Sequence, residues 1–217
     1  MFQTISSLAF LATLAGVVIH WFVSPVGAEA RGGCIVRGMV QVLSLLLVEQ
    51  RSSLLGALKK LCYLLAALSF VILAITGSYP LLIQGEHISG YLMMIHATFA
   101  PIFALCLAIL ALTWASHFRF AKDDCPCLQR LLRRVTRLRI PVPEGQCQWT
   151  SVGQKAAFWA VVALSLPLIL SILLSMFHLF GTHWQELLLA IHRWTAVVFG
   201  IAVILLTYLT IRIRLAE

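Results

Sequence analysis

Charged side chains are scarce in this chain. They make up 11% of its 217 residues, while 61% of the residues are apolar. A soluble domain usually has about 25% charged residues and about 45–50% apolar ones, so the composition excludes an ordinary water-soluble protein. Acidic residues are the rarer sign, eight against 16 Lys and Arg, and no pair of carboxylates stands inside an apolar run.

Motifs for catalysis by the chain alone are also absent. The sequence has no mononucleotide fingerprint and no nucleophile-elbow motif. Its six cysteines lack the spacing that an iron–sulfur cluster or a c-type haem requires. Those in the basic connections are predicted to face the cytoplasm, where thiols stay reduced, so we expect no disulfide framework. The two cysteines of DDCPC, residues 123–127, make an incomplete metal site.

Five long apolar runs predict the fold. About 20 apolar residues span a bilayer as a helix, and the runs are too long and too uniform for the strands of a membrane barrel. The sequence therefore predicts an all-α membrane protein with about five transmembrane helices. The runs cover residues 5–23, 61–82, 91–116, 156–180 and 187–211. We interpret the first as an uncleaved anchor rather than a signal peptide, because it lacks a basic start.

The distribution of positive charge predicts the orientation. Lys and Arg gather in the connections 26–60 and 117–155 and in the tail, whereas the connections 83–90 and 181–186 have none. The positive-inside rule then places the N-terminus outside and the C-terminus in the cytoplasm. The net charge of +8 follows from this topology and predicts no nucleic-acid partner. The basic segment 125–139 suits anionic lipid headgroups or a protein partner.

One twelve-residue phrase occurs twice. GEHISGYLMMIH, residues 85–96, is followed 96 residues later by GTHWQELLLAIH, residues 181–192. At the same offset Phe103 matches Phe199. The segments 61–116 and 156–211 are therefore predicted to be tandem helical hairpins of one four-helix bundle. Residues 1–57 would add an N-terminal transmembrane helix and a cytoplasmic interfacial segment.

Each copy of the phrase ends in a histidine within a predicted span. Ionisable side chains are costly in a bilayer, and those found there are usually functional. The repeat places His96 and His192 at one depth on two helices, which suits axial ligation of a haem iron. The alternative is that each is a hydrogen-bonded helix contact. Arg193 is the candidate partner of a haem propionate, or its guanidinium extends to the outer headgroups.

The other histidines are interpreted by their predicted depth. His87, His178 and His183 lie near the outer surface, where they have either an interfacial role or contacts with a quinone. His20 and His117 lie toward the cytoplasmic ends of the first and third spans. If these two side chains faced each other, they would hold a second haem.

The second hairpin resembles a known family. Residues 154–209 carry an FW opening, an FG connection, IHRW at 191–194 and a terminal YL. This stretch resembles the last two spans of the cytochrome b (gamma) subunit of membrane-bound formate dehydrogenases and related di-haem b-type membrane anchors. LKKLCYLLAALSFVILAITGSYPLL, residues 58–82, is similar to that family's first span. The resemblance covers residues 58–211 and implies a cytochrome b-like, haem-binding bundle for residues 58–217.

The resemblance also implies which ligands are present. Family members usually carry two b haems, and His96 and His192 match the ligands of the outer one. The positions of the two inner ligands hold Cys62 or Tyr63 and Leu206, so both are missing together. One haem b is therefore expected, and a second only if His20 and His117 rebuild the inner site.

Together these patterns predict a b-type cytochrome subunit in the cytoplasmic (inner) membrane of a bacterium or archaeon. As part of a respiratory oxidoreductase complex, it would pass electrons between an iron–sulfur or multihaem cytochrome c subunit at the outer face and a quinone such as menaquinone. It would transfer electrons within that complex rather than act as an enzyme alone. The alternative from another class is a redox-silent membrane anchor derived from such a cytochrome.

Overall fold

The chain is helical throughout nearly all of the part that its computed structural model describes, which is residues 1–24, 54–85, 87–121, 124–127, 129–130, 149–177 and 181–216. These residues contain no strand. The helices are α1 Phe2–Val23, α3 Leu54–Ser78, the π-helix η1 Tyr79–Gln84, α4 Gly90–Trp114, α6 Trp149–Met176 and α7 Thr182–Ala216. Five helical segments, one of them α3 with η1, are long and apolar enough to cross a membrane. The prediction of an all-α membrane protein with about five spans is confirmed.

Each long helix begins ahead of the apolar run that predicted it. α6 begins at Trp149, ahead of the run that starts at 156, and α7 begins at Thr182, ahead of the run that starts at 187. Hydropathy marks only the part of a helix that suits hydrocarbon, whereas the backbone hydrogen bonds continue into polar flanks. The sequence therefore located the spans but not the ends of the helices.

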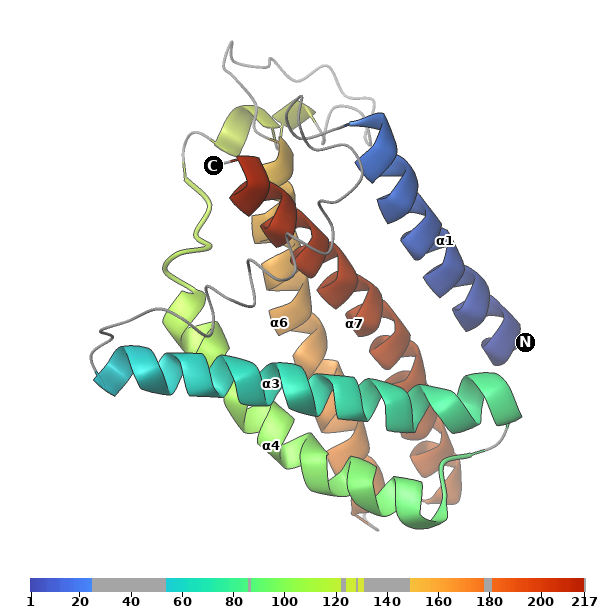
Figure 1. Ribbon diagram of the computed structural model, residues 1–217. Coiled ribbons are helices and arrows are strands. Elements are labelled where there is room, and N and C mark those ends of the chain that lie inside the picture. The colour runs from blue at the N-terminus through green and yellow to red at the C-terminus, as the bar shows by residue number, and fades with distance from the viewer. Residues whose placement is uncertain are drawn as a thin grey trace.

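The four helices α3, α4, α6 and α7 form two hairpins. α3 packs against α4 and α6 against α7, and contacts within each hairpin are more extensive than those between α4 and α6. Figure 1 shows the turns of both hairpins at the lower end of the molecule, with α3 crossing in front of α6 and α7. Both copies of the repeated phrase thus begin at the same end of the molecule, as the tandem-hairpin prediction requires.

A shared aromatic core joins the two hairpins. Phe103 of α4 and Phe199 of α7 are buried together with Val161 of α6. Phe70 of α3 completes the cluster, with its ring centroid 6.0 Å from that of Phe103 and 6.1 Å from that of Phe199. Lipid gives helices no hydrophobic drive to associate, so close packing of this kind is what holds such a bundle together.

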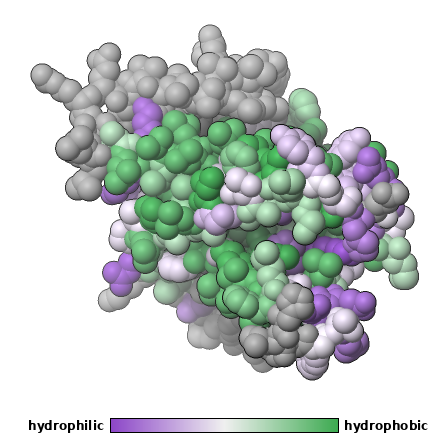
Figure 2. All heavy atoms as spheres, turned by 90° about the horizontal axis from the view of Figure 1, so that it is seen from below, coloured by the Kyte–Doolittle hydropathy of each residue, from purple (hydrophilic) through white to green (hydrophobic). Residues whose placement is uncertain are grey.

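The outer surface of the described part is apolar. Every long helix exposes large hydrophobic side chains, among them Leu11 of α1, Leu68 of α3, Leu112 of α4, Leu166 of α6 and Val198 of α7. In Figure 2, which views the molecule from below, hydrophobic residues cover most of the coloured surface, and hydrophilic ones gather mainly at one side. Such a surface suits contact with hydrocarbon rather than water.

α1 docks against the second hairpin and against η1. Gln3 Nε2 donates to the backbone oxygen of Leu82 at 2.6 Å. A Cβ atom at Gly200 would lie 3.2 Å from the ring of Phe10. The missing side chain at position 200 therefore admits a ring of α1 against α7, and this contact joins the N-terminal helix to the bundle.

Candidate functional site

His96 and His192 occupy equivalent places in the two hairpins. Phe103 and Phe199 follow them by seven residues, about two helical turns, so each histidine shares a helix face with its phenylalanine. The two phenylalanine rings meet at 90° with centroids 6.0 Å apart. Both histidines are half-buried. The structure thus places the two histidines at equivalent positions on helices whose phenylalanine rings meet.

The ring of His192 is held by α6, the first helix of its own hairpin. Its Nδ1 lies 2.9 Å from the backbone oxygen of Leu168. A carbonyl oxygen can only accept, so Nδ1–H donates and Nε2 carries the free lone pair. Metal-binding histidines almost always donate their other ring N–H in this way.

The ring of His96 is held by α3, again the first helix of its hairpin. Its Nδ1 lies 2.9 Å from Thr76 Oγ1, and that hydroxyl donates to the backbone oxygen of Ile72 at 2.7 Å. Because the hydroxyl hydrogen is used, Thr76 accepts from Nδ1–H, and His96 also keeps its lone pair on Nε2. Ile72 is the counterpart of Leu168 at the repeat offset of 96. His192 therefore bonds directly to the carbonyl of Leu168, whereas His96 is linked to the equivalent carbonyl of Ile72 through the hydroxyl of Thr76.

Gly77 fixes the position of the His96 ring. A Cβ atom at residue 77 would lie 3.2 Å from Cε1 of His96 and 3.7 Å from its Nδ1. The first distance is tighter than ordinary van der Waals contact, so a side chain at position 77 would displace the ring. Glycine is therefore required here by the close approach of α3 to an imidazole.

Two Nε2 lone pairs on neighbouring helices suit an iron that brings its own macrocycle. The macrocycle supplies the in-plane ligands, and imidazoles commonly take the axial positions. Within the described residues, no group of three or more His, Cys, Asp or Glu side chains converges on one point, whereas a structural zinc site uses four ligands. Among these residues, the two imidazoles are fewer ligands than a structural zinc site uses.

Arg193 is connected to the outer end of the first hairpin. Its Nη2 lies 2.5 Å from His87 Nδ1, so the guanidinium donates and this ring nitrogen accepts. The sequence did not predict the contact. It uses one nitrogen of Arg193 and leaves further N–H groups for an anion, and the role of Arg193 at a haem propionate stays a prediction.

The remaining candidates for quinone contacts are placed as follows. His87 is exposed ahead of α4, and His183 is exposed at the start of α7 with its ring centroid 6.5 Å from that of Trp184. His178 lies outside the described residues. A role in quinone binding stays a prediction for all three.

The two histidines considered for a second haem have other neighbours. His20 Nδ1 lies 2.5 Å from the hydroxyl of Tyr208 and 2.8 Å from Arg212 Nη1. His117 follows the end of α4, and its ring meets that of Phe118 edge-on at 5.2 Å. No contact recorded between described residues joins His20 to His117, and the second haem stays a prediction.

The side chains at the positions where the sequence resemblance implied missing inner ligands pack in apolar clusters. Cys62 is buried between α3 and α4 with Cys106, and Tyr63 packs against the same cluster. Leu206 packs against the cluster of Phe103 and Phe199. These side chains stabilise contacts between helices.

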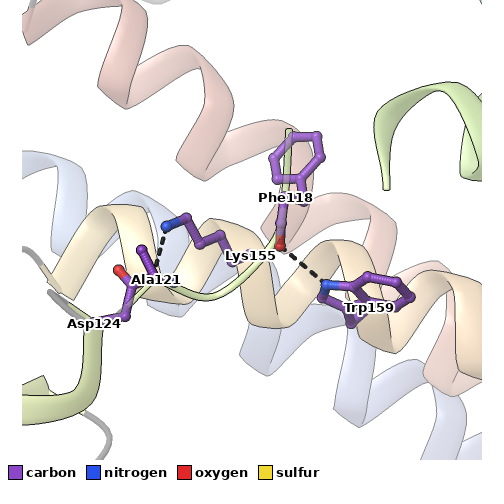
Figure 3. A network of polar contacts seen from close by, with 5 residues as sticks. All are labelled: Phe118, Ala121, Asp124, Lys155 and Trp159. Carbon is purple, nitrogen blue, oxygen red and sulfur yellow. Dashed lines mark hydrogen bonds and ion pairs between the residues drawn. The ribbon is translucent and has the colours of Figure 1, made fainter. Parts of the chain in front are cut away.

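A polar junction fixes the start of α6 beside the chain that follows α4 (Figure 3). Asp124 Oδ2 lies 2.6 Å from Lys155 Nζ and accepts from the amide of Ala121 at 2.8 Å. Trp159 Nε1 donates to the backbone oxygen of Phe118 at 3.0 Å. Burial raises the pKa of Asp124, but the hydrogen bonds from Lys155 and Ala121 and the charge of Lys155 outweigh it and lower the pKa below 3.8.

One cysteine near this junction differs from the sequence-based expectation. Cys125 is free and exposed, whereas Cys127 is disulfide-bonded. The expectation that all cysteines of the basic connections are reduced is therefore wrong for Cys127. It rested on the predicted compartment alone, and a compartment does not decide which sulfur atoms the fold brings within bonding distance.

Sequence reasoning missed the groups that orient the two histidines. Thr76 carried a usable signal, because a hydroxyl within an apolar span needs a partner. The carbonyl of Leu168 carried none, since every residue has one and only the pairing of helices selects it.

Comparison with known proteins identifies no relative whose site could be compared with this one. No family model, no curated protein and no solved structure matches the chain. Its function therefore has to be inferred from its own residues and their geometry.

Proposed function

We propose that this chain is a b-type cytochrome membrane subunit of a respiratory oxidoreductase complex, with His96 and His192 as the axial ligands of one haem b. One observation carries the proposal. Each Nδ1 donates to an oxygen on the first helix of its own hairpin, and the two acceptors lead to equivalent carbonyls. A histidine that served only to join two helices would have no need to keep its Nε2 lone pair in both copies.

The chain's own residues would bind the haem iron, orient the two ligand rings and shield the site from water. His96 and His192 would supply Nε2, while Thr76 and the Leu168 carbonyl hold the two rings and make the imidazoles more basic ligands. The phenylalanine cluster two turns away closes the inner side of the site and limits access of water. When bound, the haem supplies the one-electron redox chemistry, and the protein sets its placement and electrostatics.

The surroundings of the pair support a position near the outer membrane face. The turns of both hairpins lie at one end of the molecule (Figure 1), and these two connections carry no Lys or Arg. The positive-inside rule then puts this end outside the cytoplasmic membrane of a bacterium or archaeon. An iron–sulfur or multihaem cytochrome c subunit would dock there, and a quinone would contact His87, His178 or His183.

The alternative is a redox-silent membrane anchor, and one observation favours it. Phe70, Phe103 and Phe199 contact one another directly, so the core shared by the two hairpins is packed by side chains alone. Under this alternative, His96 and His192 would serve as polar helix contacts. Haem content separates the two functions.

Substitution of the ligands tests the proposal. His96→Leu and His192→Leu, purified from cells, are each expected to lose the reduced haem b absorption bands, while the control His183→Leu keeps them. His192→Met extends the test if a leucine variant fails to assemble, because methionine is also an axial ligand and raises the midpoint potential. Unchanged spectra in both leucine variants would contradict the proposal.

A further inference from the structure

Three polar side chains meet near the C-terminal ends of α1 and α7, away from His96 and His192. His20 stands in the last turn of α1, and Tyr208 and Arg212 stand one turn apart on α7. Arg212 Nη1 lies 2.8 Å from His20 Nδ1 and 3.0 Å from the Tyr208 hydroxyl, which itself lies 2.5 Å from His20 Nδ1. The ring of Trp21 packs on Tyr208 with centroids 6.3 Å apart.

The hydrogen bonds of this cluster orient the guanidinium of Arg212. Nη1 carries two hydrogens, and the His20 ring and the Tyr208 oxygen accept them. The opposite edge, formed by Nε–H and Nη2–H, has no partner among the described residues. An arginine edge with two parallel N–H groups matches two oxygens of one phosphate. The cluster therefore presents a fixed bidentate donor rather than a freely rotating charge.

The surroundings favour a phosphate that is attached to a lipid. Ile19, Phe22 and Val23 of α1 expose 61%, 75% and 74% of their surface beside the cluster, and acyl chains suit such side chains. Both helices reach the end of their apolar stretch here, at the depth where headgroups lie. Basic pockets between transmembrane helices on the cytoplasmic side are typical sites for anionic headgroups.

We propose that Arg212, oriented by His20 and Tyr208, binds the phosphate of an anionic phospholipid at the adjoining ends of α1 and α7. Such a lipid would bridge the N-terminal helix and the bundle at the end opposite the Gln3 contact. The site does not include His96 or His192, so its failure leaves the proposed function untouched.

Native mass spectrometry of the full chain in a neutral detergent tests this site. With phosphatidylglycerol and diacylglycerol, which has no phosphate, at equal concentrations, the unmodified protein is expected to prefer phosphatidylglycerol about tenfold, as a charge-assisted hydrogen bond allows. Arg212→Gln should abolish the preference. Arg214→Gln is the matched control, because it removes the same charge two residues away, on a different helix face, and should retain the preference.

One further variant and one competition experiment test whether the site recognises a lipid phosphate through paired N–H groups. Arg212→Lys keeps the charge but loses the paired N–H edge, so it should also lose most of the preference, and it serves if Arg212→Gln does not fold. Millimolar inorganic phosphate should not displace the lipid. Retained preference in both Arg212 variants would overturn the proposal, and so would displacement by inorganic phosphate, which would identify a site for free phosphate.

Discussion

His192 donates its Nδ1–H to the backbone oxygen of Leu168, 2.9 Å away. The equivalent oxygen in the first hairpin, that of Ile72, is reached by His96 through the hydroxyl of Thr76. The two copies of the repeat therefore share more than the histidines themselves. In both copies the ring donates its Nδ1–H to the first helix of its own hairpin. Both Nε2 atoms therefore keep a lone pair for a ligand.

The hydroxyl of Thr76 is predicted to set the properties of His96 as a ligand. Thr76→Val keeps the shape of the side chain and removes the acceptor of Nδ1–H. Loss of such a partner typically costs about 10–100-fold in metal affinity, and a less basic imidazole stabilises the ferric state less. We expect weaker retention of haem and a higher midpoint potential, measured by redox titration of the absorption spectrum.

The control for this variant is Thr98→Val. Thr98 stands on α4 close to His96, is exposed, and donates only to the oxygen of Met94 in its own helix. Its substitution should leave both the haem content and the potential unchanged. Equal effects of the two variants would show that Thr76 acts through general stability and would contradict its role as a positioning residue.

The close approach of Gly77 to His96 gives a steric prediction. Gly77→Ala adds a methyl group 3.2 Å from Cε1 of His96, so either the ring or α3 has to shift. Overpacking of this kind typically costs about 1–3 kcal/mol. We expect a lower melting temperature in detergent together with altered low-temperature haem bands. Gly16→Ala, where a Cβ atom meets nothing within 4 Å, should leave the haem bands unchanged and should not lower the melting temperature, because alanine suits a helix interior better than glycine.

Arg193 is predicted to tune the potential through its charge. A positive charge near the iron favours the reduced state, so Arg193→Gln should lower the midpoint potential by roughly 70 mV if the guanidinium acts from about 10 Å at an effective dielectric constant of about 20. Arg214→Gln removes an equal charge at the other end of α7 and should have little effect. A potential unchanged by Arg193→Gln would place the guanidinium too far away to hold a propionate.

The ion pair of Asp124 and Lys155 is predicted to make stability depend on pH. The pKa of Asp124 lies below its ordinary 3.8, so the pair stabilises the fold fully above about pH 4 and loses this effect as the pH falls through the lowered value. Asp124→Asn should cost roughly 1–3 kcal/mol at neutral pH. Melting curves in detergent at falling pH should then converge for the variant and the unmodified protein.

The control for this pair is Glu186→Gln. Glu186 is exposed at the start of α7 and has no ion pair with any described residue. Its melting curves should follow those of the unmodified protein at every pH. A difference between Asp124→Asn and the unmodified protein that persists in acid would mean that Asp124 contributes through packing rather than through its charge.

The sequence predicted the parts of this protein that depend on hydropathy and repetition. Five apolar runs located the spans, and the offset of 96 residues selected His96 and His192, because a duplicated chain folds each copy alike. It could not predict the contact of Arg193 with His87 or the proximity of His20 to Arg212. Those contacts depend on which helix faces meet, and α1 belongs to no repeat.

The most direct test of the cytochrome assignment is the haem content of the purified protein, measured as the pyridine haemochrome and divided by the amount of chain. We predict one haem b per chain, bound by His96 and His192. Two would indicate that an inner site also exists, for which His20 and His117 are the candidate ligands. A chain that is folded, assembled in the membrane and free of haem would contradict the assignment and identify the protein as an anchor.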